Sequence, residues 1–274
     1  MFGKLLKYEF RYMMRIFLPM WGLFLVLSVI NGFTVPQMAS SDGASIVGFL
    51  FMLALVLVAS ALWVVSFVVI IQRFYNGLLK DEGYLMFCLP VKSGALINAK
   101  GLAAVILMCI TIVVGLLGIF VILSLSVWSD VSLSEVGRAI EQMFINLTGY
   151  GVGPFQLTMM VIWFILMMLS SVASFMYMIY LAMALGHLAK KHRVAWSIGA
   201  YLLINMLMST VSTLVFQFAD WPAIGELVME SMSGMSASQA LVTMEVGYTV
   251  VNLVLTLLFF FITRWILETR LNLE

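Results

Sequence analysis

Charged residues are scarce in this chain. Asp, Glu, Lys and Arg make up 10% of its 274 residues and hydrophobic residues 64%, whereas a soluble domain carries about a quarter charged residues. Soluble enzymes, nucleic-acid-binding domains and disordered scaffolds all present charge to water, so the composition excludes these three classes. Cysteine is scarce as well, and the two cysteines of the chain predict no disulfide framework.

Sequence motifs of common enzymatic chemistry are also missing. The chain contains no GxxxxGK(S/T) phosphate loop and no HExxH, CxxC or GxSxG pattern. We therefore expect that it is not an enzyme and holds no cofactor of its own. The two histidines, His187 and His192, flank a short basic loop without a nearby carboxylate, so we expect surface residues and not metal ligands.

Long apolar segments take up more than half of the chain. Six segments of 18 to 30 residues contain no charged residue, and a bilayer core needs roughly 20 apolar residues per helix. These segments are apolar on every side, which fits lipid-embedded helices and not the alternating strands of a barrel. The sequence predicts an all-α, multi-pass membrane protein with one transmembrane domain over residues 1–274. The predicted spans are 16–35, 46–71, 101–127, 157–186, 194–218 and 246–263.

The predicted spans lack acidic, basic and histidine side chains, although proton-driven carriers place such groups in the membrane. If the chain takes part in transport, we therefore expect the energy to come from a partner. The polar residues inside the spans are interpreted as interhelical hydrogen-bond partners. These are Asn31, Asn205, Gln217 and Asn252.

The distribution of Lys and Arg predicts the orientation. In a six-span topology, thirteen of the fourteen Lys and Arg residues fall on the side of the two termini, and only Arg138 falls on the other. Cytoplasmic loops carry the excess of positive charge, so both termini are predicted to be cytoplasmic. A signal peptide is the alternative for the first span, but an apolar run of 20 residues exceeds a usual signal-peptide core, which favours a retained span.

Residues 2–17 have the pattern of an amphipathic helix, and residues 2–15 are predicted to be its interfacial part. At 100° per residue, four basic side chains fall within an arc of about 80°, and apolar side chains fill a similar arc opposite them. Such a helix lies with its basic side toward lipid headgroups and its apolar side toward acyl chains. It is either a plain membrane anchor, which we favour, or an elbow that moves during transport. The basic residues are Lys4, Lys7, Arg11 and Arg15, and the apolar ones are Phe2, Leu6, Phe10, Met13 and Phe17.

The predicted cytoplasmic loop between spans two and three covers residues 73–100. It is the only predicted inner loop large enough for a structured contact, and it places apolar side chains such as Tyr84 and Phe87 beside the charges of Lys80 and Asp81. One interpretation is a loop that rests on the membrane interface. The other is a docking element for a soluble partner, with an apolar anchor and a charged rim.

Within this loop, KDEGYLMFCLPVKSGALINAK resembles the cytoplasmic loop of permease subunits of type-two ATP-binding cassette exporters, in forms common among Gram-positive bacteria. Those proteins typically read DEGYL…LPV…LL.AK between spans two and three. The basic N-terminal segment with LLKYEF and the six spans with both termini inside are similar too. The resemblance depends most on Asp81, Glu82, Gly83, Tyr84, Leu89 and Pro90.

The resemblance implies a permease in a bacterial plasma membrane that dimerises with an identical or related subunit. Each permease would bind a separate ATPase subunit, which holds ATP and magnesium, through a coupling helix formed by residues 80–92. The N-terminal helix would be the connecting helix, and substrate would move outward. The family often has re-entrant helices between spans five and six, so residues 219–245 are either re-entrant or an external cap.

Two further classes of function stay open from the sequence: a secondary carrier or channel, and a membrane scaffold that transports nothing. The substrate is not identified. The 22 methionines suit a path for amphipathic peptides, lipids or drugs, although ordinary lipid-facing and packing roles explain them better. Expected partners are the lipid membrane, the ATPase and the second permease, with no nucleic acid.

Overall fold

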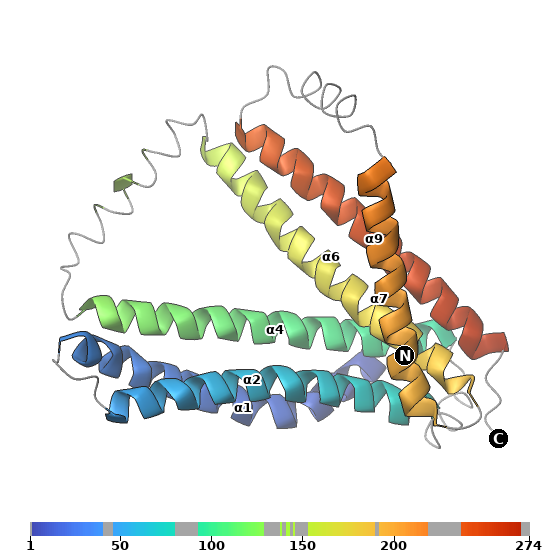
Figure 1. Cartoon of the computed structure of the whole chain (residues 1–274), viewed down its shortest axis with the longest axis horizontal. Helices are drawn as coiled ribbons and strands as arrows, with labels where there is room; N and C mark the ends of the chain where they lie inside the picture. The colour runs from blue at the N-terminus through green and yellow to red at the C-terminus, as the bar shows by residue number, and fades with distance from the viewer. Residues whose placement is uncertain are drawn as a thin grey trace. The chain divides into compact units, whose positions relative to one another are not determined.

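The chain folds into long helices (Figure 1). The structure is a computed structural model, and the residues it describes form no strand. Its described residues are 2–40, 46–79, 93–128, 138, 141, 142, 145, 153–189, 192–218 and 237–269. The helices are α1 (Phe2–Ser40), α2 (Ile46–Phe74), the π-helical turn η1 (Tyr75–Leu79), α4 (Ser93–Trp128), α6 (Pro154–His187), α7 (Arg193–Phe218) and α9 (Ala237–Thr269).

Six of these helices are long and apolar enough to cross a membrane. Each contains one of the six predicted spans, so the prediction of an all-α, six-helix membrane protein is confirmed. Helices are the natural form for such segments, because a helix satisfies its backbone hydrogen bonds internally where lipid offers no partner.

The predicted interfacial segment is the first part of α1, which continues without a break from Phe2 to Ser40. No glycine or proline lies in residues 4–18, so nothing in the sequence stops the helix where the basic segment meets the first span. The expectation that the whole apolar side meets acyl chains is wrong for Met13 and Phe17, which are each 1% exposed. Both side chains are part of a protein interior.

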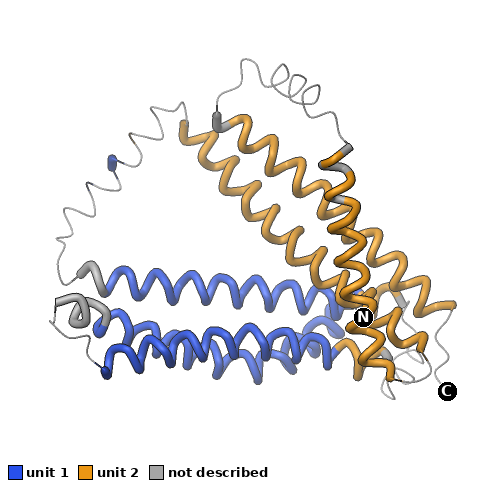
Figure 2. Tube along the Cα trace, viewed as in Figure 1, with its two compact units in different colours: residues 1–73, 98–143 blue, residues 74–97, 144–274 orange. Residues whose placement is uncertain are grey.

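The described residues divide into two compact units (Figure 2). Unit 1 comprises residues 1–73 and 98–143, and so contains α1 and most of α2 and α4. Unit 2 comprises residues 74–97 and 144–274, with η1, the start of α4, α6, α7 and α9. The chain therefore leaves unit 1 at the end of α2 and returns to it early in α4.

In unit 1, the buried side of α1 is marked by Met13, Phe17, Trp21 and Phe24, at the spacing of three and four residues that lines up one side of a helix. Trp21 donates a hydrogen bond through Nε1 to the hydroxyl of Thr111 in α4, at 3.2 Å. This bond joins two helices inside the apolar part of the unit, where the indole would otherwise lack an acceptor.

Replacing Thr111 with valine is expected to lower the free energy of unfolding by about 1 kcal/mol, since the buried indole of Trp21 loses its acceptor. The measurement is denaturant unfolding of the purified protein in detergent, followed by circular dichroism. Thr243→Val in α9 is the matched control, because the Thr243 hydroxyl is exposed and bonds only the Gln239 carbonyl of its own helix in the structure. Equal effects of the two substitutions would contradict the prediction.

The polar residues inside the spans are interpreted from the sequence as interhelical hydrogen-bond partners, and the structure shows such a bond for one of them. Asn31 donates through Nδ2 to the Phe51 carbonyl of α2, at 3.1 Å, which is an interhelical bond. For Asn205 and Asn252 the interpretation is wrong, because each amide donates to a carbonyl of its own helix, four residues earlier. Gln217 is exposed. A side-chain amide that donates to its own helix is satisfied without a partner helix.

In unit 2, α6 packs against both α7 and α9. Its buried residues begin at Ser170 and become almost continuous from Met176 to His187. Tyr177 meets Phe260 of α9 edge to face, with ring centroids 6.0 Å apart. At its end, Gly186 lies directly against the backbone of Ser197 in α7. The second half of α6 is thus the core of unit 2.

Candidate functional site

The residues that carry the sequence resemblance lie outside the described residues. The structure describes the chain up to Leu79 and again from Ser93, so it shows only the flanks of the predicted coupling segment. The residues concerned are Asp81, Glu82, Gly83, Tyr84, Leu89 and Pro90. Their role as a contact for an ATPase stays a prediction.

Both flanks of this segment are held inside unit 2. Before it, Phe74 is fully buried and stacks on Tyr180 of α6, with ring centroids 3.9 Å apart and planes inclined by 17°. After it, Leu96 and Ile97 are buried, and Gly94 lies beside Phe260 of α9. A displacement of the segment would therefore reach the packed helices α6 and α9.

The flank before the segment ends in η1, a π-helical turn next to α2. Such turns are rare, and they occur frequently at functional sites. Leu78 of this turn is fully buried, and η1 contacts α6. The turn that follows α2 is thus packed against α6.

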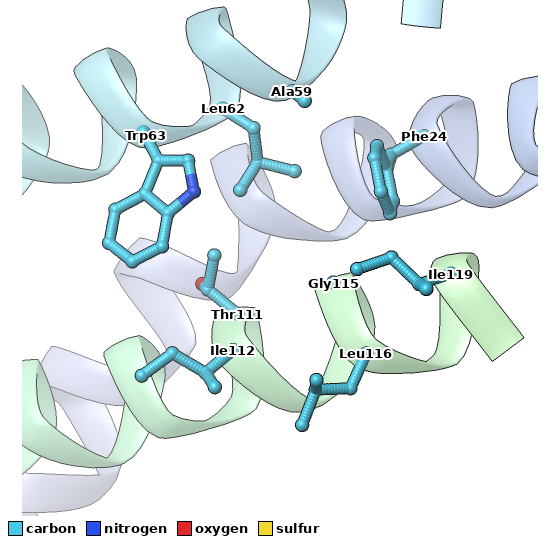
Figure 3. A pocket seen from close by; sticks show the side chains of 9 residues that line it. All are labelled: Phe24, Ala59, Leu62, Trp63, Thr111, Ile112, Gly115, Leu116 and Ile119. Atoms are coloured by element: carbon cyan, nitrogen blue, oxygen red, sulfur yellow. The ribbon is translucent and has the colours of Figure 1, made fainter. Parts of the chain in front are cut away.

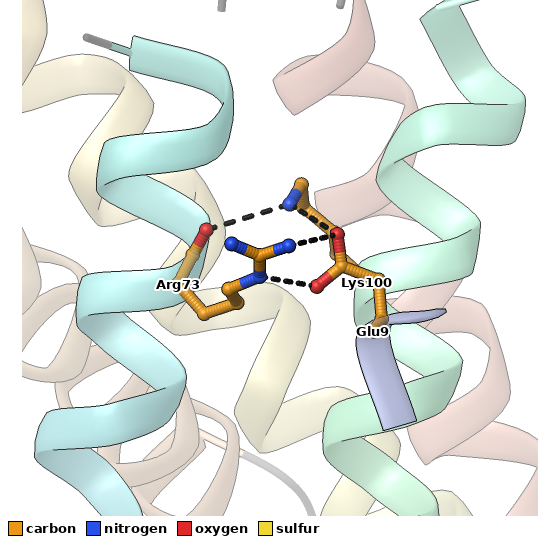
Figure 4. Close-up of polar contacts among 3 residues, drawn as sticks. All are labelled: Glu9, Arg73 and Lys100. Carbon is orange, nitrogen blue, oxygen red and sulfur yellow. Dashed lines mark hydrogen bonds and ion pairs between the residues drawn. The ribbon is translucent and has the colours of Figure 1, made fainter. Parts of the chain in front are cut away.

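Three charged side chains meet within unit 1, one each from α1, α2 and α4 (Figure 4). The Glu9 carboxylate of α1 accepts from Arg73 at the end of α2, with Nε 2.5 Å from Oε2 and Nη2 3.2 Å from Oε1. Lys100 of α4 donates through Nζ to the same carboxylate, 2.7 Å from Oε1. Its Nζ also lies 3.5 Å from the Arg73 carbonyl oxygen. We call these three residues the ion cluster.

Two residues of the ion cluster are buried and the third is partly buried. The side chains of Glu9 and Lys100 are each 3% exposed and that of Arg73 is 19% exposed. The Arg73 guanidinium also lies over the Tyr12 ring, 4.6 Å from its centroid, a cation–π contact that suits a charge withdrawn from water. Buried charges are tolerated only when they are paired with good geometry, and here one carboxylate is shared by two cations.

The ion cluster joins the N-terminal helix to the two helices that flank the predicted coupling segment. Arg73 stands immediately before Phe74, where the chain passes into unit 2, and Lys100 follows shortly after its return. The Glu9 carboxylate on α1 therefore binds one residue on each side of residues 74–97, the part of unit 2 that runs from the end of α2 to the start of α4 in the chain. This arrangement is suited to transmitting displacement between helices.

Sequence reasoning missed Glu9, although a signal was present. Glu9 is the only acidic residue in residues 2–17, and at 100° per residue it lies about 160° from the centre of the basic arc. An acid on the apolar side of an amphipathic helix needs a buried cation as a partner.

The predicted membrane-interface residues Lys4, Lys7, Arg11 and Arg15 are exposed in the structure.

The expectation of surface histidines is correct for His192 and wrong for His187. His192 is exposed, with a positive φ of 54°, whereas His187 is 8% exposed. Arg193 donates through Nη1 to Nε2 of His187, at 3.2 Å, and Tyr75 of η1 meets the ring edge to face. His187 is buried because it continues the buried side of α6 to its last residue. Among the described residues, no three His, Cys, Asp or Glu side chains are placed to hold a metal.

Comparison of the chain with models of protein families, with curated proteins and with solved structures finds no match.

Proposed function

We propose that this chain is the membrane-spanning permease subunit of an ATP-binding cassette exporter, driven by a separate ATPase subunit. The observation that carries the proposal is the ion cluster of Glu9, Arg73 and Lys100. It ties the helices on both sides of the DEGYL…LPV segment to the N-terminal helix. A loop used for energy coupling needs flanking helices that move with it and do not bend away.

The physical route for energy starts at residues 80–92. A force on this segment acts on unit 2 through the buried flanks at Phe74 and Ile97. It acts on unit 1 through α2 and α4, whose ends are cross-linked by the ion cluster. Packed interiors do not deform continuously, so displacement at the loop is passed on to the spans.

In this proposal the loop and both termini face the cytoplasm of a bacterial cell, and the chain pairs with a second permease subunit in the plasma membrane. ATP and magnesium are held by the partner ATPase. The substrate is an amphipathic or hydrophobic molecule such as a peptide, lipid or drug, and it is moved outward. The distribution of Lys and Arg supports this orientation.

Purification from the native membrane in mild detergent tests the class of function. We expect a soluble subunit with a Walker motif to copurify in stoichiometric amount, with vanadate-sensitive ATPase activity. A preparation that contains this chain alone, even after crosslinking, would contradict the proposal. It would favour a carrier if flux follows an ion gradient, and a scaffold if there is no flux.

Charge reversal at Asp81 and Glu82, or Tyr84→Ala, is expected to uncouple ATP hydrolysis from movement of the permease, because each change removes part of the contact proposed for the ATPase. The measurement is the change in the proteolysis pattern of the permease when the complex is trapped with ATP and vanadate, which requires no known substrate. We expect the change to disappear while the permease dimer persists.

Glu268→Lys is the control for this prediction, since Glu268 is an exposed carboxylate outside the loop. It should leave the trapped pattern as in the unmodified protein. Retained coupling in both loop variants, the charge reversal at Asp81 and Glu82 and Tyr84→Ala, would remove residues 80–92 from the proposed ATPase contact.

A further inference from the structure

Unit 1 contains a cavity of about 230 Å³ between α1, α2 and α4 (Figure 3). All of the helix surfaces around it belong to the same unit. The side chains that line it include Phe24 of α1, Leu62 and Trp63 of α2, and Thr111, Gly115 and Ile119 of α4.

The chemistry of the cavity is apolar. The described residues that line it carry no charge, and the Thr111 hydroxyl is already engaged on both sides. It donates to the Leu107 carbonyl at 2.9 Å and accepts from Trp21 at 3.2 Å. A ligand with polar atoms would lose its hydration here without gaining partners. A saturated or unsaturated hydrocarbon chain has no such cost.

The size of the cavity selects a narrow ligand. A cavity of roughly 150 Å³ is enough for benzene, whereas sites for drug-sized molecules have roughly 300–1,000 Å³. The volume of about 230 Å³ therefore fits a stretch of one hydrocarbon chain and not a whole amphipathic molecule.

The mouth of the cavity lies on the surface that the spans present to lipid. Trp63 of α2 and Leu116 and Ile119 of α4 line the cavity and are exposed, in the middle of helices apolar enough to cross a membrane. A chain that enters from the bilayer stays in hydrocarbon throughout, while its polar head remains outside.

We infer that this cavity binds one acyl chain of a membrane phospholipid. The site is separate from the proposed ATPase contact, and it would exist in a carrier or a scaffold as well. A bound chain would fill the space between three helices and so make their packing depend on the surrounding lipid.

Gly115 offers a direct way to close the cavity. A Cβ atom added at Gly115 would meet no atom within 4 Å, so a larger side chain can extend into the cavity without displacing the backbone. Gly22 of α1 provides the matched control. It is exposed, it does not line the cavity, and its added Cβ also meets nothing within 4 Å.

The test uses the full chain in nanodiscs of dioleoylphosphatidylglycerol with a trace of the same lipid bearing a diazirine in the middle of one acyl chain. After irradiation, labelled peptides are mapped by mass spectrometry. We expect residues 59–63 and 111–119 to be labelled severalfold above residues 253–258 of α9, a predicted membrane-spanning stretch with mostly exposed side chains. Gly115→Leu should lower the cavity labelling about tenfold, because the leucine side chain would occupy the space that the acyl chain fills, and Gly22→Leu should leave it unchanged.

Labelling of the cavity at the level of residues 253–258, or labelling unchanged by Gly115→Leu, would overturn the inference. So would labelling by a diazirine-bearing fatty alcohol in the absence of labelling by the phospholipid, because the occupant would then be a free amphiphile. If Gly115→Leu does not give a monodisperse helical protein, Ala59→Leu fills the same cavity from α2 and is judged by the same outcomes.

Discussion

Glu9→Gln is expected to lower the free energy of unfolding by about 3–5 kcal/mol, the cost of breaking a buried ion pair by removing the charge of one partner. The substitution keeps the size of the side chain, so the effect reports charge and not packing. It leaves the Lys100 ammonium and the Arg73 guanidinium facing a neutral amide in place of the carboxylate that both now contact. Denaturant unfolding in detergent, followed by circular dichroism, gives the free-energy difference.

Glu268→Gln is the matched control for Glu9→Gln. The ion pair of Glu268 with Arg264 is within one helix and both side chains are 40% exposed, so its loss should cost about 0.5 kcal/mol or less. Equal destabilisation by the two substitutions would refute the view that the ion cluster holds the helices together.

A double substitution measures how strongly Glu9 and Lys100 depend on each other for stability. Adding Lys100→Met to Glu9→Met removes one buried cation together with the carboxylate. We expect the double variant to be more stable than the sum of the single effects predicts, since residues that share an interaction are not additive. Additive effects would mean that Glu9 and Lys100 do not depend on each other.

Gly186→Ala is expected to be the second most damaging change, with a loss of about 3 kcal/mol in the free energy of unfolding. The new methyl group would meet the backbone N and Cα of Ser197 as well as its hydroxyl. Backbone atoms cannot rotate away as the end of a long side chain can, so α6 and α7 must separate at their junction. The same unfolding measurement applies.

Gly199→Ala tests whether the effect at Gly186 depends on close packing. Gly199 lies in α7, and a Cβ added there meets nothing within 4 Å. Alanine is the better helix former by about 1 kcal/mol, so this variant should be as stable as the unmodified protein or slightly more stable. A comparable loss in both variants would show that the α6–α7 contact is not the cause.

The candidate site was only partly accessible to sequence reasoning. The exposed basic side of residues 2–15 could be predicted from helical periodicity, and the structure places Lys4, Lys7, Arg11 and Arg15 accordingly. The partners of Glu9 could not, because Arg73 and Lys100 are 64 and 91 residues away along the chain. His187 shows the same limit, since its contacts with Arg193 of α7 and Tyr75 of η1 could not be read from the sequence.

The helical fold and the six membrane-spanning segments follow from the amino-acid sequence alone. Uncharged apolar runs of 18 to 30 residues suffice for this conclusion, because lipid admits such runs only as structures that satisfy their own backbone. Three features could be seen only in the three-dimensional structure: Glu9 joins α1 to α2 and α4, Asn205 and Asn252 bond their own helices, and Gly115 lines a cavity. Hydrophobicity acts on each segment alone, whereas pairing and packing depend on which segments meet.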